Sequence, residues 1–459
     1  MAEQVARAAD WLTIHEALAR ILDSVRPLPP ENVPLLEAVG RTLAEDVVSP
    51  IDHPPWDNSA MDGYAARAQD VRGAGSATPV VLRLLEEVPA GGFPTRPLGA
   101  GETTKIMTGA PIPDGADSVI RLEHTRQEGD RVVVLADTDA GRNLRRRGED
   151  LRAGARLFAA GRVLRGGEIG VLAACGRPHV RVHRRPRVAI LSTGDELVDL
   201  DRFDEARAGR KIVNSNSYAL AASVLASGCT PVLLGIARDE RTDLREHLQR
   251  AFAADVLVTS AGASVGEHDL VKDVLRELGF RLDFWRVRIR PGSPFSFGML
   301  PRPSATAPAR TPAPAVPAAA AVPTPEHTPD YAPQALPVFG LPGNPVSALV
   351  TFQVLVRPAL RRMLGRRALH NVTLRVRAAE RITTRPGLVQ FLRARLEPDP
   401  AGRWQARLTG PQGSGIQLSM ALADALLILP EDAEVVEAGQ ELLAMPLWPV
   451  DAASEPLPP

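Results

Sequence analysis

Apolar and polar positions follow a different pattern in each part of the chain. In residues 11–26 the apolar side chains recur at roughly helical spacing and the run ends before Pro27, which predicts an amphipathic helix. Residues 51–149 instead carry short β-like runs broken by Gly and Pro turns, at 80–85, 104–107, 118–121 and 131–135. This stretch is therefore predicted to form a separate, mainly β domain.

A second change of pattern comes at Pro186, beyond which apolar strands alternate with helical stretches. Strands that alternate with helices of this length form βαβ units and a mostly parallel sheet covered on both faces. Such sheets bind ligands at the carboxyl ends of their strands. Strands are expected at 188–191, 231–236 and 256–259, and helices at 217–226, 241–253 and 270–278.

The remaining segments complete a multidomain α/β plus β protein. Residues 141–178 are Gly-rich and irregular, residues 345–364 predict a helix, and residues 371–448 return to short β-like runs. We expect a central α/β domain with a mostly parallel sheet, a mainly β domain and a C-terminal β-rich domain. The predicted boundaries are 11–50 with 150–180 for a linking domain, then 51–149, 181–369 and 370–448.

Residues 301–337 interrupt the α/β domain and contain 11 of the 42 prolines of the chain, interleaved with Ala and Thr. They offer no periodic apolar face, which indicates a flexible insertion. The insertion separates strand-like residues 294–298 from strand-like residues 338–341, so we expect it to extend the tip of a hairpin. A passive surface extension is favoured over a Pro-rich ligand for a partner.

Composition narrows the class of protein. Lys plus Arg and Asp plus Glu each total 54, so the formal net charge is zero and nucleic acid is not the expected partner. The cysteines, Cys175 and Cys229, lie far apart in sequence and are predicted to be buried thiols in a reducing cytoplasm. We found no signal region and no apolar run of about 18 residues, so we expect a cytoplasmic protein without a membrane segment.

The first loop that follows a predicted strand, residues 192–197, combines Ser192, Thr193 and Gly194 with two carboxylates. Carboxylates at a strand end suit hydrated Mg²⁺, which takes one or two of them alongside substrate phosphates. A polar turn with a helix cap is an equal alternative for this loop alone. Asp239 follows another predicted strand, where a helix cap is the commonest role.

The second loop, residues 260–269, lies between a predicted strand and a predicted helix. Small residues let the backbone approach a phosphate, and the N–H groups of the following helix favour an anion. Asp269 has an alternative role as a first-turn residue favoured by the helix dipole. The candidate ligand-binding residues are Ser260, Gly262, Ser264 and Gly266.

In the third loop, residues 340–347, Asn344 is the expected N-cap and Pro345 the first helical residue. A cap alone does not need Pro342 and Gly343, so a rigid anion-binding turn is favoured. Several such loops along one edge of a sheet predict a rim that binds a nucleotide or phosphate.

Three further motifs lie outside the α/β domain, at 54–65, 108–113 and 145–150. The last contains three consecutive arginines, whose guanidinium forks match phosphate oxygens. A solvated run of charge is an equal alternative for that cluster.

These motifs, in this order, resemble the MoeA family of molybdopterin molybdenumtransferases, which includes the E domain of gephyrin. The resemblance runs from about residue 11 to residue 445 and is interrupted by the Pro/Ala-rich insertion. Several long motifs in one order are more specific than a lone glycine pattern. The matching segments are 57–65, 107–111, 146–150, 192–197 and 341–347.

The resemblance implies a homodimer that binds adenylylated molybdopterin, inserts molybdate at the dithiolene and releases AMP with Mg²⁺. It places each active site between the α/β domain of one chain and the β domain of the other. It also implies a molybdopterin adenylyltransferase and molybdoenzyme apoproteins or chaperones as partners. The catalytic candidates carried over by position are Asp62, Thr108, Asp150, Glu196, Asp239 and Asp269, with Glu196 and Asp269 as metal ligands.

The sequence also departs from the family pattern. Ala261 stands where the family usually has Gly, and Ser293 replaces a Lys, while Arg290 can supply part of the missing charge toward the cofactor. Two alternatives therefore stay open: molybdopterin adenylylation, and a noncatalytic scaffold that binds molybdopterin. The motifs around Asp62, Thr108 and Asp150 favour insertion over adenylylation.

Overall fold

The structure is a computed structural model that describes residues 11–260, 270–303 and 335–447. Its contacts divide the chain into two compact units. One unit comprises residues 34–36 and 45–180, and the other comprises the rest of the chain. The four domains expected from the sequence are a finer division and stay a prediction.

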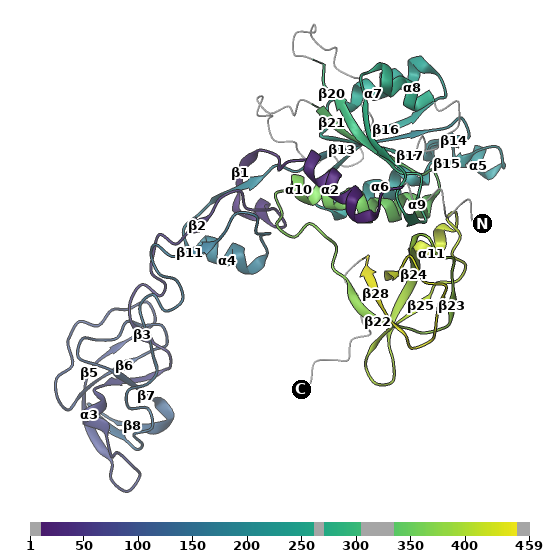
Figure 1. Cartoon of the computed structure of the whole chain (residues 1–459). Helices are drawn as coiled ribbons and strands as arrows, with labels where there is room; N and C mark the ends of the chain where they lie inside the picture. The colour runs from purple at the N-terminus through teal and green to yellow at the C-terminus, as the bar shows by residue number, and fades with distance from the viewer. Residues whose placement is uncertain (1–10, 261–269, 304–334, 448–459) are drawn as a thin grey trace. The chain divides into compact units, whose positions relative to one another are not determined.

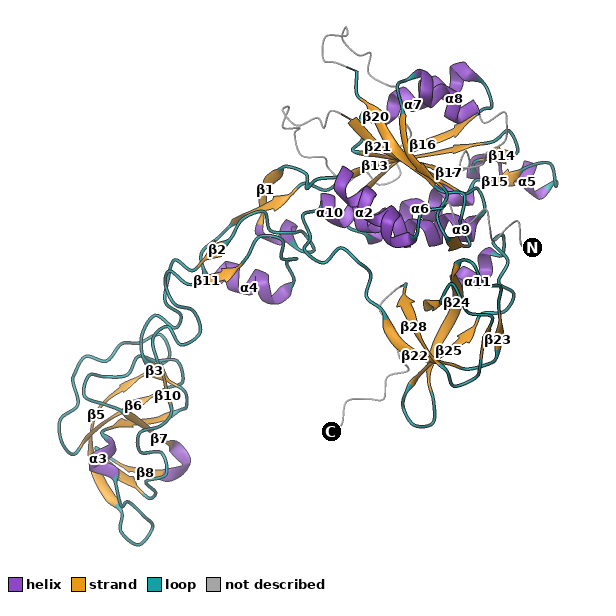
Figure 2. Cartoon of the chain, in the orientation of Figure 1, coloured by secondary structure: helices purple, strands orange, loops and turns teal. Residues whose placement is uncertain are grey.

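The unit of residues 45–180 is built around an antiparallel-rich sheet, drawn as orange arrows in Figure 2. The strand order is β7-β4-β6-β5-β9-β8. Neighbouring residues of β4 face opposite cores, because Ala65 packs with Val119 whereas Ala66 packs with Ile120. The mainly β character is as predicted. The strands are β4 Gly63–Ala66, β5 Val80–Val88, β6 Glu102–Ile106, β7 Ser118–Arg121, β8 Thr125–Glu128 and β9 Arg131–Val134, with short helix α3 at Ala68–Val71.

Residues 141–178 are less irregular than predicted, because they contain helix α4, Gly166–Ala174. Glycine inside a helix costs about 1 kcal/mol, which is why the sequence pattern hides this element. Leu172 is completely buried, a gain of about 2 kcal/mol that outweighs the cost. Glu168 accepts a hydrogen bond from the Arg165 backbone N–H at 2.9 Å and caps the first turn. The short pairs in this unit are β2 Val47–Val48 with β11 Arg156–Phe158, and β3 Asn58–Ser59 with β10 Leu144–Arg145.

The other unit contains a sheet with strand order β16-β13-β17-β21-β20-β18 among the described residues. The first four strands are parallel, and β20 pairs antiparallel with β21 and β18. The mostly parallel sheet expected from the sequence is therefore confirmed. The strands are β13 Arg187–Thr193, β16 Thr230–Ala237, β17 Val256–Ser260, β18 Arg281–Trp285, β20 Ser296–Pro301 and β21 Ala335–Leu341.

Helices cover both faces of this sheet (Figure 1). Val188 and Ile190 of β13 pack into the core that includes α6 and α10, whereas Ala189 and Leu191 pack into the core of α7 and α8. Both faces are dry, which explains the continuous apolar strands in the sequence. The helices are α2 Ile14–Ser24, α6 Ser215–Ala226, α7 Arg241–Ala251, α8 Leu270–Glu277, α9 Pro345–Thr351 and α10 Arg357–Met363.

The helix predicted over residues 345–364 is confirmed, but its middle is π-helical. A π-helical segment, η4 at Phe352–Val356, separates α9 from α10, and the Arg357 N–H donates to the Phe352 carbonyl five residues back. Pro358 follows directly, and its ring removes a donor and crowds the preceding turn. The wider π turn places this proline without ending the helix.

The strands on either side of the Pro/Ala-rich insertion pair as a hairpin, with Pro301 opposite Ala335. This confirms the predicted hairpin, but its strands extend into the predicted insertion at Pro301 and at 335–337. Residues 304–334 lie outside the described part. The C-terminal sheet has the order β19-β24-β25-β22-β28-β26. Its strands are β19 Ile289–Arg290, β22 Leu374–Ala378, β24 Val389–Pro398, β25 Trp404–Leu408, β26 Ala425–Leu429 and β28 Glu441–Pro446, accompanied by helix α11 Gln417–Ala421.

No helix in the part of the chain that the structure describes is long and apolar enough to cross a membrane. Cys175 and Cys229 are both buried and unbonded to each other, as predicted.

Candidate functional site

The carboxyl ends of the parallel strands meet along one edge of the α/β sheet. Thr193 lies opposite Ala237, and Ser260 lies opposite both Ser192 and Leu341. The loops that carry the candidate residues therefore begin side by side. The chain leaves β13 toward β16 on one side and returns to β17 on the other, which makes this edge a topological switch point.

Ser192 and Thr193 are buried at the end of β13. The Ser192 hydroxyl donates to Asn214 Oδ1 at 2.9 Å and lies 2.9 Å from Ser217 Oγ. Asn214 is the N-cap of α6 and accepts from the Ser217 N–H. The Ser192 hydroxyl is thus engaged in fixing the start of α6 against the sheet.

Gly194 follows with φ +136°, a conformation that L side chains rarely adopt. An added Cβ there would lie 2.4 Å from Glu196 Oε2, so the glycine makes room for that carboxylate. The neighbouring loop after β16 approaches as well, since the Asp239 N–H donates to Asp195 Oδ1 at 3.4 Å. The Lys211 ammonium donates a hydrogen bond to the Asp195 carbonyl.

Three exposed carboxylates, Asp195, Glu196 and Asp239, gather at this edge. Desolvation raises the pKa of Asp239, and the charges of Asp195 and Glu196 raise it further. Of the Mg²⁺ ligands expected from the sequence, Glu196 lies at this edge, and Asp269 lies outside the described residues. No group of three His, Cys, Asp or Glu in the described part of the chain is close enough to chelate a metal by itself.

Asn216, in the first turn of α6, ties two of the candidate loops together. Its Nδ2 donates to Ser260 Oγ at 2.8 Å and to the Gly343 carbonyl at 2.7 Å. Sequence analysis did not identify this residue. The available signal was the Asn-Ser-Asn-Ser run at residues 214–217, which places amides and hydroxyls at a helix start beside a strand end.

The third loop begins α9 at Pro345, with Asn344 at the N-cap position as predicted. The Asn344 side chain does not cap the helix, however. Its Nδ2 donates to Ser414 Oγ at 2.9 Å, and the Val346 N–H donates to the Ser414 carbonyl at 3.1 Å. Ser414, in a loop of the C-terminal β-rich part, therefore accepts the hydrogen bonds that this helix start offers. Pro342 is buried, while Gly343 is exposed.

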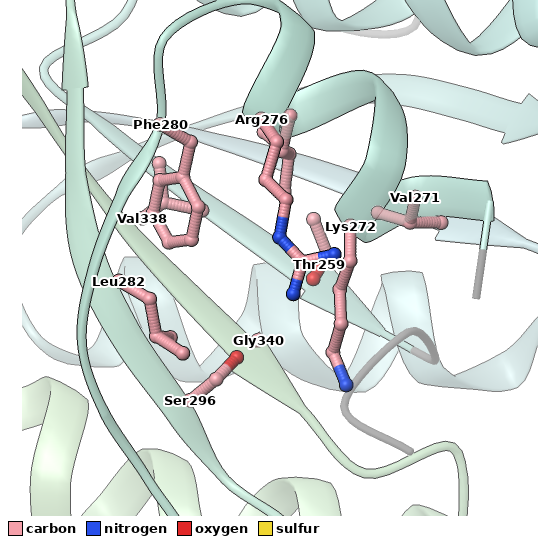
Figure 3. A pocket seen from close by; sticks show the side chains of 10 residues that line it. Thr259, Val271, Lys272, Arg276, Phe280, Leu282, Ser296, Val338 and Gly340 are labelled. Carbon is pink, nitrogen blue, oxygen red and sulfur yellow. The ribbon is translucent and has the colours of Figure 1, made fainter. Parts of the chain in front are cut away.

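A cavity of about 110 Å³ lies beside this edge, between α8 and the strands (Figure 3). Figure 3 shows Lys272 and Arg276 extending from α8 toward the strands that carry Thr259 and Gly340. Arg276 also donates to Asp273 at 3.3 Å. These cations were not predicted from the sequence. The available signal was that Lys272 and Arg276 follow the small-residue loop and are four residues apart, which puts them on one helix face.

The turn around Arg290 and Ser293 lies near the same edge. β20 begins at Ser296, opposite Gly340, and a Cβ on Gly292 would lie 2.4 Å from Thr351 of α9. Arg290 is exposed and pairs with Gln390 in the C-terminal sheet. The Ser293 hydroxyl donates to the Ile289 carbonyl at 2.6 Å.

Part of the second loop lies outside the described residues. The candidates in that part are Gly262, Ser264, Gly266 and Asp269, together with the departure at Ala261.

In the β-rich unit, Asp62 and Thr108 form one local structure. Asp62 Oδ1 accepts from the Thr108 N–H at 2.7 Å and from its hydroxyl at 2.8 Å. These hydrogen bonds, the backbone one first, hold the pKa of Asp62 below its usual range. Asp150 is exposed, and its N–H donates to the His53 carbonyl at 3.1 Å.

The arginine cluster that precedes Asp150 is partly neutralised within this unit. Arg146 donates to Asp57 at 2.6 Å, and Arg147 donates to Asp52 at 2.8 Å. Two of the three guanidinium groups thus hold their own loop together, and an exposed Arg145 is left for solvent or ligand.

The sheet is open, is covered on both faces, and carries amides, small residues and carboxylates at its carboxyl edge. These features define a multidomain α/β protein of the kind that binds ligands at that edge. Models of known protein families match successive parts of the chain. The MoeA N-terminal region (domain I and II) matches residues 12–176, a probable molybdopterin binding domain matches 189–362, and the MoeA C-terminal region (domain IV) matches 375–447. The chain belongs to the MoeA family.

Individual relatives span nearly the whole chain. The molybdopterin molybdenumtransferase of Nostoc sp. is 38% identical over 427 residues, which cover 91% of this chain and 88% of the relative. Molybdopterin molybdenumtransferase 2 of Mycobacterium tuberculosis is 34% identical and covers 94% and 98%. The crystal structure of the molybdopterin biosynthesis MoeA protein of Pyrococcus horikoshii superposes with a TM-score of 0.77 at 30% identity, covering 95% and 100%.

Proposed function

We infer that this chain, a molybdopterin molybdenumtransferase of molybdenum cofactor biosynthesis by family, inserts molybdenum into adenylylated molybdopterin and releases AMP. The observation that carries the proposal is the edge of the α/β sheet, where Asn216 ties the end of β17 to the turn before α9. That arrangement holds the two loops side by side at the edge where sheets of this type bind their ligands.

Cations beside this edge support the binding of an anionic substrate. Lys272 and Arg276 border the cavity next to Thr259 and Gly340, one residue before the respective strand ends. An ammonium and a guanidinium there neutralise phosphate oxygens or molybdate oxygens. Both cations belong to α8, so this chain has positive charge at the cavity although Ser293 stands where the family pattern has a lysine.

Mg²⁺ is proposed to bind at Glu196, where Asp239 and Asp195 lie close by, and at Asp269, which the resemblance to the family adds. When bound, the ion supplies Lewis-acid stabilisation of the charge on the departing phosphate. The chain's own residues hold the reactants: Asn216 fixes the two loops, and Gly194 leaves space for the Glu196 carboxylate. Water attacks phosphorus and the bond to the bridging oxygen of the phosphoanhydride breaks, which frees AMP and leaves molybdopterin with its phosphate. The two thiol groups of molybdopterin bind molybdenum and displace one oxo group of molybdate as water.

Asp62, Thr108 and Asp150 are proposed to complete the catalytic residues from the β-rich unit. Asp62 is held ionised by its two hydrogen bonds from Thr108, so its free oxygen is fixed as an acceptor. Adenylylation alone would leave this arrangement without a role.

We also propose that the protein is a homodimer. Light scattering after gel filtration tests this directly.

Replacing Gly194 with Ala is expected to raise the Mg²⁺ concentration needed for half-maximal activity by about tenfold. The added Cβ would meet the Glu196 carboxylate, and the backbone at φ +136° would be strained by about 1 kcal/mol. Mg²⁺ titrations of AMP release measure this. Gly209→Ala, at a positive φ with no atom near the added Cβ, controls for backbone strain, and equal effects of both changes would refute the steric argument.

Asn216→Ala is expected to raise the KM for adenylylated molybdopterin about tenfold, because two loops lose their common donor. Steady-state kinetics measures the effect. Tyr218→Phe, which removes only a hydroxyl bound to Asp199, is the matched control on the same helix. A KM unchanged in both variants would contradict the positioning role.

The function itself is tested by supplying purified protein with adenylylated molybdopterin, molybdate and Mg²⁺ and adding an apo-molybdoenzyme. Insertion predicts that the apoenzyme becomes active only in the complete mixture. A scaffold predicts bound molybdopterin with no activation, and an adenylyltransferase predicts activity from ATP and unmodified molybdopterin instead.

A further inference from the structure

A second cavity, of about 370 Å³, lies at the other end of α6 from Asn216. Ser223 and Ala226, in the last turns of α6, border it. Ten residues of helix separate Asn216 from Ala226, which corresponds to about 15 Å along the axis. The cavity is therefore distinct from the edge proposed to bind adenylylated molybdopterin.

Two arginines border this cavity, which we call the arginine pocket. It is bordered by Arg357 and Arg361 of α10, by the amides Gln353 and Asn371, and by an apolar wall. The apolar wall consists of Ala226, Val372, Pro446 and Leu447. The volume of the arginine pocket lies in the range of small-molecule sites. Such sites usually combine an apolar wall with a few polar groups.

The two guanidinium groups have no carboxylate partner among the described residues. Arg357 donates from Nη1 to Gln353 Oε1 at 3.0 Å. Arg361 donates from Nη1 to the carbonyls of Leu369 at 3.2 Å and His370 at 2.5 Å. The other nitrogens of both groups make no hydrogen bond within the described part of the chain. These guanidinium N–H groups can therefore donate hydrogen bonds to a ligand in the cavity.

The electrostatic cost of this arrangement is visible in the pKa values. Burial first, and then the charges of Arg357 and Arg366, lower the pKa of Arg361 to about 10. Burial and Arg366 lower the pKa of Arg357 as well. The C-terminal end of α6 contributes partial negative charge nearby, but a helix end supplies only about half a unit charge. Like charges held together in this way are stabilised when an anion binds between them.

We propose that the arginine pocket is a second ligand site, which binds the phosphate or carboxylate group of a small organic molecule. Guanidinium forks match both oxyanions in geometry, and the amides of Gln353 and Asn371 add orientation. Asn371 Nδ2 donates to the Gln353 carbonyl at 2.7 Å, which fixes this amide at the border of the pocket. The apolar wall accommodates the carbon part of the molecule.

The test is calorimetric titration of the full chain with inorganic phosphate and, separately, with citrate. The paired change Arg357→Gln with Arg361→Gln is expected to remove one binding site per chain or to weaken it at least tenfold. Arg367→Gln is the matched control, since Arg367 is exposed directly beyond α10. It should leave binding within twofold of the unchanged protein.

Two further variants keep the outcome interpretable. Asn216→Ala should retain this site, which separates it from any phosphate bound at the catalytic edge. Arg357→Lys with Arg361→Lys retains the charge and should show weakened but measurable binding, even if the Gln pair proves unstable. The proposal is overturned if neither probe binds, or if the Gln pair folds and binds both probes as the unchanged protein does. Preference for phosphate or for citrate identifies which oxyanion the pocket favours.

Discussion

Replacing Asp62 with Ala is expected to lower kcat for AMP release by about 100-fold or more, with folding and oligomeric state unchanged. Asp62 is exposed, so its loss empties no core. It does remove the acceptor of both hydrogen bonds from Thr108, and it removes a fixed negative charge at the start of β4. Steady-state kinetics combined with circular dichroism measures the two effects separately.

Asp62→Asn divides the role of this residue into geometry and charge. The amide oxygen can still accept from Thr108, so a large loss of kcat in this variant assigns the effect to charge. Asp130→Ala is the matched control, because Asp130 is an exposed carboxylate between two strands of the same sheet. Loss of folding in Asp62→Ala, or turnover equal to that of the control, would contradict the assignment of Asp62 to the site.

Replacing Arg393 with Met is expected to destabilise the unit by about 3 kcal/mol and to raise KM as well. Arg393 is completely buried in β24, and burial lowers its pKa to about 10. Its guanidinium donates to the carbonyls of Pro411, Gln412 and Gly413 at 3.0 to 3.3 Å. The variant would leave those carbonyls without their donor.

The effect on KM follows from the loop that Arg393 holds. That loop continues to Ser414, which accepts from Asn344 and Val346 at the start of α9. Urea unfolding followed by circular dichroism measures the stability, and Arg395→Met is the control, since Arg395 is exposed on the same strand. An unchanged unfolding midpoint would show that the loop carbonyls are satisfied without Arg393.

Long periodic segments made the fold readable from the sequence. The strands at 188–191 and 256–259 and the helix at 241–253 were found within a few residues, because both faces of the sheet are apolar and the helices are amphipathic. The helix α4 was missed because Gly170 lowers its propensity while tertiary burial of Leu172 stabilises it.

The details of the candidate site were less accessible. The sequence placed Ser192, Asn344 and the acidic loops at strand ends, but the direction of a side chain depends on what packs beside it. Ser192 faces α6, and Asn344 faces Ser414 in place of its own helix. The role of Asn216 depends on the register between β17 and β21, which local pattern does not encode.

The most direct test of the central claim is a single-turnover measurement of AMP release from adenylylated molybdopterin bound to the purified protein. We expect AMP to appear only when molybdate and Mg²⁺ are both present, with one molybdenum cofactor formed for each AMP. Glu196→Gln is expected to slow AMP release and to raise the Mg²⁺ concentration that the remaining activity requires. Tight binding of the substrate with no AMP released under any condition would contradict insertion and would point to a molybdopterin-binding scaffold.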